Sequence, residues 1–113
     1  MIKVSLEQGR VHKNSNLCIA TEYDIGDKDI DIATAIINGR YPEKGYCVNT
    51  KVKEIIFVIE GRGAIYKENQ SISFKAGDVI FIDKNEKYYW NAKCKVTMSC
   101  YPAWYPEQHI EVE

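Results

Sequence analysis

The run EIIFVIE, at residues 54–60, limits most strongly what this chain can fold into. It has the length of a strand and consists mainly of β-branched and aromatic residues, which favour strands. Successive side chains of a strand point to opposite faces, so Glu54 shares its face with Ile56, while Ile55 and Phe57 point the other way. Both faces are apolar and need cover, from a second sheet or from another subunit. We therefore expect a layered β protein that forms a homodimer.

Turn-forming sequences separate this run from further strand candidates. The glycines of GRG, at residues 61–63, predict a tight turn that joins EIIFVIE to GAIYKE as a hairpin. Another turn, KAGD at residues 75–78, precedes the strand candidate VIFID, and DKNE at residues 83–86 precedes YYW. Short strands alternating with such turns predict an all-β fold of antiparallel strands.

The first third of the chain adds three shorter strand candidates. These are IKVSL within residues 1–8, LCIATEY at residues 17–23 and IATAIING at residues 32–39. The stretch QGRVHKNSN between the first two is prone to turns, which places His12 in a solvated loop. The aspartates of DIGDKDIDI do not have the spacing of a calcium-binding EF-hand loop, so we expect a charged loop there.

Two spacings in the centre of the chain resemble the motifs of small single-domain cupins. Glu54 and Gly61 are separated by six residues, as the Glu and the Gly of the first cupin motif are. The second motif begins with a Gly, an acidic residue and an apolar strand, which Gly77, Asp78 and the following VIFI match. The next turn departs from the motif, because residues 83–85 read Asp-Lys-Asn in place of Pro-x-Gly.

This resemblance implies a fold for the whole chain. Cupins are antiparallel double-stranded β-helices, also described as jelly-roll barrels. We expect a single cupin domain over residues 1–113, with N-terminal strands within 1–39, the motif region at about 45–101 and an extended tail at 102–113. The prolines of the tail exclude a helix across its first half, so its aromatic residues would hold an extended segment against the barrel.

The resemblance also indicates where a metal would bind. Typical metal-binding cupins use a His-x-His pair, the Glu of the first motif and a His of the second. Here the pair falls on Cys47 and Asn49, or on Val48 and Thr50 if the spacing is one residue shorter. The last ligand falls on Tyr88. Only Glu54 remains, and one carboxylate does not hold a transition metal well. We expect no metal and no other cofactor.

The same positions outline a small-molecule pocket with polar groups between apolar and aromatic walls. The expected ligand-binding residues are Cys47, Asn49, Glu54, Tyr88, Trp90 and Tyr101. His109 could in principle fold back as a ligand, but we expect the C-terminus to be peripheral.

Three functions remain open for this pocket. The first is binding of an unidentified small molecule without a metal. The second is a metal-independent isomerase, epimerase or lyase, in which burial raises the pKa of Glu54 so that it acts as acid or base and Tyr88 donates to a substrate oxygen. The third is a metal enzyme whose unusual ligands are Cys47, Asn49 and Glu54, with His109 or water.

Composition excludes other classes. The 113 residues carry a net charge of −1 without a basic stripe, which argues against nucleic acid as a partner. No apolar run is long enough to span a membrane, and the N-terminal MIKVSLEQGR lacks the apolar core of a signal peptide, so we expect a cytoplasmic location and no membrane partner. The four cysteines show no Cys-x-x-Cys spacing and are expected to be reduced, buried thiols.

Overall fold

The computed structural model describes all residues, 1–113, and consists almost entirely of strands. In chain order the elements are η1 (Leu6–Gln8), β1 (Arg10–Ser15), β2 (Cys18–Tyr23), β3 (Asp31–Tyr41), β4 (Tyr46–Asn49), β5 (Lys53–Lys67), β6 (Gln70–Lys75), β7 (Val79–Ile82), β8 (Lys87–Tyr101), η2 (Pro106–Gln108) and β9 (His109–Val112). Both η elements are single 3₁₀ turns. All strand pairs are antiparallel, as predicted.

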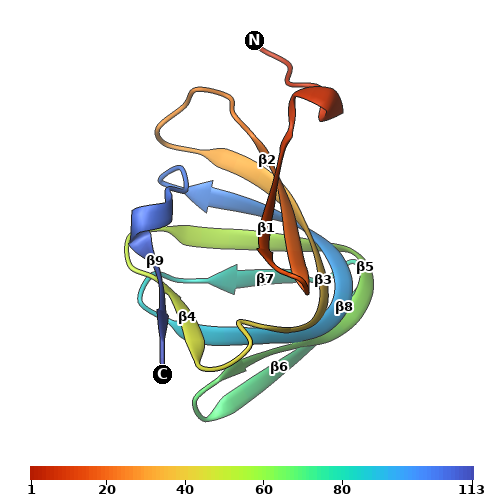
Figure 1. Ribbon diagram of the computed structural model, residues 1–113, viewed down its shortest axis with the longest axis vertical. Coiled ribbons are helices and arrows are strands. Elements are labelled where there is room, and N and C mark those ends of the chain that lie inside the picture. The colour runs from red at the N-terminus through yellow and green to blue at the C-terminus, as the bar shows by residue number, and fades with distance from the viewer.

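The long strand β8 is the centre of the sheet. Along one edge it pairs with β3, which continues through β2 to β1, and along the other it pairs with β5. Its first residues also pair with β4, and β4 pairs in turn with the C-terminal β9. The sheet therefore curls around one interior, and the chain's last strand closes one side of it (Figure 1).

The predicted hairpin at residues 61–63 is wrong. β5 runs without interruption through these residues, and the true hairpin lies at its end, where β5 meets β6. A bulge between Val58 and Glu60 and a positive φ of 86° at Gly61 bend the strand instead, so that both halves stay paired with β8. A Cβ at Gly61 would lie 2.1 Å from the Lys93 carbonyl oxygen, so the close approach of β5 and β8 requires glycine here.

The N-terminal prediction is also partly wrong. Residues 1–5 form no strand, and the first strand is β1, in the stretch expected to be a loop. β1 is the edge strand of a hairpin with β2, and its exposed polar residues hid the strand pattern. The predicted strands at 17–23 and 32–39 are confirmed as β2 and β3.

Alternation along β5 and β8 places the core inside the curl. Glu54, Ile56 and Val58 are at most 6% exposed, as are Val96 and Cys100 on the facing strand. All four cysteines are free and buried, as predicted.

The outward face of the same strands is apolar and exposed. We call it the outer patch, and it comprises Ile19, Ile32, Ile36, Ile55, Phe57, Ile59, Val79 and Phe81. The strand register makes it continuous, because β2 pairs with β3, β7 pairs with β5, and β8 lies between β3 and β5.

No helix in the structure has the length and apolarity that a membrane crossing requires.

Candidate functional site

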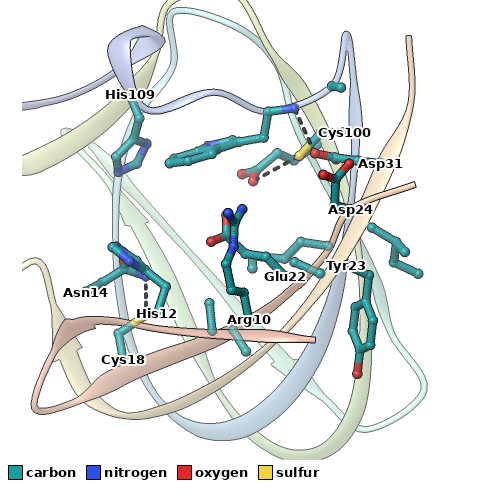
Figure 2. A pocket seen from close by; sticks show the side chains of 18 of the residues that line it. Arg10, His12, Asn14, Cys18, Glu22, Tyr23, Asp24, Asp31, Cys100 and His109 are labelled. Carbon is teal, nitrogen blue, oxygen red and sulfur yellow. Dashed lines mark hydrogen bonds between the residues drawn. The ribbon is translucent and has the colours of Figure 1, made fainter. Parts of the chain in front are cut away.

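A cavity of about 230 Å³ lies inside the curl of the sheet and opens at one end. Its inner walls carry small and apolar side chains, among them Ala20, Ala35 and Ile37. Polar side chains gather towards the opening, where β1, the β2–β3 loop and the C-terminal segment meet (Figure 2). Because it combines largely apolar walls with convergent polar groups, this cavity is the candidate binding site.

Glu54 lies in the cavity wall and is 6% exposed. Its Oε2 accepts a hydrogen bond from Asn49 Nδ2 at 3.1 Å, and its Oε1 accepts one from Cys100 Sγ at 3.6 Å. Burial raises the pKa of this carboxyl, and the hydrogen bonds from Asn49 and Cys100 oppose that rise only in part. A carboxyl with a raised pKa is a candidate general acid or base.

Two further predicted residues line the cavity beside Glu54. Tyr88 and Trp90 lie on the inward face of β8 and are 5% and 4% exposed. Burial, followed by the charge of Glu54, raises the pKa of Tyr88 well above its ordinary value, so its hydroxyl stays protonated and can donate to a ligand. The indole of Trp90 is fixed by an edge-on contact with Phe74, with ring centroids 5.6 Å apart.

The structure places the other predicted residues elsewhere. Cys47 and Asn49 are fully buried behind the cavity wall, and neither borders the cavity. Tyr101 is 59% exposed on the outer surface, because its neighbour Cys100 takes the inward position at the end of β8. The expectation that Tyr101 borders the pocket is thus corrected, and Trp104 occupies the rim instead.

Several rim residues were missed by sequence reasoning. Arg10, His12 and Asn14 alternate along β1 and reach into the opening from one side (Figure 2). Asp24 and Asp31 reach it from the ends of the β2–β3 loop. The alternation of Arg, His and Asn was the signal for β1, but their polarity suggested a loop. His12 is therefore not the loop residue we expected.

The C-terminal segment reaches the site through buried contacts. Gln108 is 2% exposed, and its Oε1 accepts hydrogen bonds from the backbone N–H groups of Lys51 and Val52 at 3.3 and 3.2 Å. The next residue, His109, borders the cavity and its Nδ1 lies 2.9 Å from Asn49 Oδ1. The expectation of a peripheral C-terminus is corrected, because Gln108 anchors the segment in the barrel.

The residues at the cupin metal positions do not fit a divalent ion. Asn49 turns its Nδ2 donor towards Glu54, and its Oδ1 receives Gln108 Nε2 at 3.1 Å as well as the His109 ring. An N–H group aimed at the carboxylate stands where a cation would have to bind. No group of three or more His, Cys, Asp and Glu side chains in the chain is arranged as a metal site.

Comparison with known families agrees with the fold. Residues 7–107 match the family model described as ethanolamine utilisation protein EutQ. The chain belongs to the EutQ family. No curated protein matches it in sequence.

Solved structures show the same barrel as this EutQ-family chain. The nucleoside dehydratase Pac13 is 16% identical, with a TM-score of 0.88 over 100% of this chain and 92% of that one, and Streptomyces PAC13 variants with uridine are equally similar. The polyketide cyclase RemF from Streptomyces resistomycificus is 12% identical, with a TM-score of 0.69 over 96% of this chain and 89% of that one.

A cupin-2 domain protein from Shewanella frigidimarina is 22% identical, with a TM-score of 0.58 over 80% of this chain and 76% of that one. At such identities the likeness shows the fold alone. It confirms that this EutQ-family protein has the fold of a small cupin.

Proposed function

We propose that this protein binds a small polar molecule inside the barrel without a metal ion. The observation that carries the proposal is the cavity itself, an apolar space with Glu54, Tyr88 and Trp90 in its wall and charged groups at its opening. Its 230 Å³ lies just below the range of about 300–1,000 Å³ typical of ligand pockets. The ligand is therefore of metabolite size, and its ring or chain would lie against Trp90.

A thermal-shift screen tests this proposal. The panel contains sugars, organic acids and nucleotides, together with nucleosides, because Pac13 acts on a nucleoside. A ligand that binds only the folded chain raises the melting temperature, and the shift should persist in excess chelator. Glu54→Gln should reduce the shift, whereas Glu60→Gln, on the exposed face of the same strand, should leave it unchanged. A shift that chelator abolishes would contradict the metal-free reading.

A second function is favoured by the state of Glu54. A carboxyl with a raised pKa, beside a protonated tyrosine in the wall of the same cavity, is suited to proton transfer. On this reading the protein is a metal-independent isomerase, epimerase or lyase that moves a proton on a carbon next to a carbonyl, with Glu54 as acid or base and Tyr88 donating to the carbonyl oxygen.

Deuterium exchange separates binding from catalysis. Each carbonyl compound that shifts the melting temperature is incubated with the protein in D₂O and analysed by mass spectrometry. Deuterium incorporation that resists chelator and is lost in Glu54→Gln supports an enzyme. Stable binding with no incorporation and no product by either protein supports a binding protein.

A further inference from the structure

A chain of hydrogen bonds through the buried side-chain amides of Gln108 and Asn49 determines which ring nitrogen of His109 carries a hydrogen. The chain starts at the backbone N–H groups of Lys51 and Val52, which can only donate. The Gln108 atom that meets both must therefore be its carbonyl Oε1. Gln108 then presents its NH₂ group to Asn49, at 3.1 Å.

The contact with Gln108 determines the orientation of the Asn49 side-chain amide. An NH₂ group needs an acceptor, so the Asn49 atom facing Gln108 is Oδ1, and Nδ2 is left for the Glu54 carboxyl. Both contacts have hydrogen-bonding distances, 3.1 Å each, so the assignment satisfies every polar atom. No buried side-chain nitrogen or oxygen in the chain lacks a partner.

The last step fixes the imidazole. His109 Nδ1 lies 2.9 Å from the same Asn49 Oδ1, which accepts only, so Nδ1 carries the hydrogen. In a neutral ring Nε2 then has a lone pair, and it makes no hydrogen bond within the chain. His109 borders the cavity, and Figure 2 shows its ring pointing into it.

We propose that His109, held as the Nδ1–H tautomer by Asn49, is a proton acceptor of the cavity in addition to Glu54. A bound molecule donates a hydrogen bond from a hydroxyl or N–H group to Nε2. In an acid–base reaction Nε2 takes up that proton, and the Nδ1–H group remains hydrogen-bonded to Asn49 Oδ1. Asn49 and Gln108 are positioning residues. The role in binding rests on the proposed function, but the tautomer does not, because the chain of hydrogen bonds fixes it without a ligand.

Histidine NMR tests the tautomer directly. His12 and His109 are the two histidines of the chain, so a long-range ¹H–¹⁵N spectrum of ¹⁵N-histidine-labelled protein near pH 8 shows two ring systems, assigned with His12→Gln. For His109 we expect the tautomer with a protonated Nδ1 and an unprotonated Nε2. It should exceed the Nε2–H tautomer by roughly tenfold, because only the first tautomer makes the hydrogen bond to Asn49. A protonated Nε2 in the unaltered protein would overturn the proposal.

Two variants separate positioning from mere stability. Asn49→Leu removes the acceptor, so the His109 spectrum should shift towards the mixture seen for a solvated ring. Asn91→Leu, on the exposed face of β8, should leave the spectrum unchanged. If Asn49→Leu does not fold, the spectrum of the unaltered protein still decides the matter.

A ligand from the thermal-shift screen tests the acceptor role separately. It should perturb the His109 Nε2 signal and bind more weakly once its hydroxyl or N–H is methylated. A confirmed tautomer without any ligand in the panel would count against the proposed function alone. A ligand that leaves the Nε2 signal unmoved would overturn the acceptor role.

Discussion

Asn49 Nδ2 lies 3.1 Å from Glu54 Oε2, so the residue at one cupin metal-ligand position donates a hydrogen bond to the residue at another. Neither side chain is more than 6% exposed. The amide thereby donates a hydrogen bond that stabilises the ionised form of the carboxyl.

This pair predicts a pH-dependent stability. Burial raises the folded-state pKa of Glu54 above the ordinary 4.5, so ionising it costs more in the folded protein than in the unfolded chain. The folded state binds more protons between those two pKa values, and the Glu54 contribution to the free energy of unfolding falls as pH rises through that window. Urea unfolding of Glu54→Gln should show no such contribution, so its stability relative to the unaltered protein should grow above pH 4.5.

His109 does not disturb this comparison. Burial lowers its pKa from 6.5, so its contribution to stability rises with pH up to that value, and it does so in both proteins. A stability difference that stays constant between pH 4.5 and 8 would contradict the raised pKa of Glu54. Glu60→Gln, which makes the same change at an exposed position of β5, is the matched control.

Gln108 should contribute strongly to stability. Gln108→Ala leaves the buried Val52 N–H and Asn49 Oδ1 without these partners, which costs about 1–3 kcal/mol for a buried unsatisfied group. Its exposed neighbour gives the control, and Glu107→Ala should change stability by less than about 0.5 kcal/mol. Urea unfolding measures both. Equal small effects would show that the C-terminal segment is not anchored as described.

Gly61→Ala should destabilise the chain more than Gly77→Ala does. Both glycines have a positive φ, 86° and 93°, so both variants carry a similar backbone strain of about 1–2 kcal/mol. Only at Gly61 does the new Cβ also meet β8, whereas nothing lies within 4 Å at Gly77. We expect roughly 1–3 kcal/mol more loss at Gly61 by urea unfolding. A larger loss at Gly77 would contradict the close approach of β5 and β8.

The cysteines should be unreactive in the folded protein. Burial raises the pKa of Cys47 to about 12 and that of Cys94 to about 11, and it raises those of Cys18 and Cys100 as well. The thiolate is the reactive form, so Ellman's reagent at pH 8 should react slowly with native protein and with four equivalents after unfolding in guanidinium. Fast reaction of one thiol in the native state would show an activated cysteine.

The outer patch leads us to propose a homodimer. On this face the small Ser99 of β8 lies between Ile32 of β3 and Ile55 of β5, which gives a hollow between two larger apolar side chains. A twofold interface brings the same surface from both copies together, and two such sheet faces can interdigitate. Light scattering should give twice the 13.0 kDa of one chain. Phe57→Lys should give the single-chain mass, and Asn91→Lys should not. A single-chain mass for the unaltered protein would exclude this dimer.

Local sequence patterns were sufficient for most of the barrel. The alternation of EIIFVIE predicted that Glu54 and Phe57 lie on opposite faces, the cupin resemblance implied that Glu54 points inward, and both expectations hold. Turn residues at 75–78 and 83–86 ended strands where predicted. These features depend on side-chain period and backbone preference, which neighbouring residues determine. The cupin resemblance implied that Glu54, Tyr88 and Trp90 share one pocket, and all three line the cavity.

Tertiary structure decided the opening of the site. Gln108 and His109 meet Asn49 across about sixty residues of chain, and only the pairing of β9 with β4 brings them there. The bend at Gly61 likewise depends on how closely β8 approaches, which the GRG sequence does not reveal. Strand period and turn chemistry are local properties, so the sequence determined the barrel and its inward face. Which distant polar groups meet at the rim depends on packing between strands, so the fold alone determined the hydrogen-bond chain to His109.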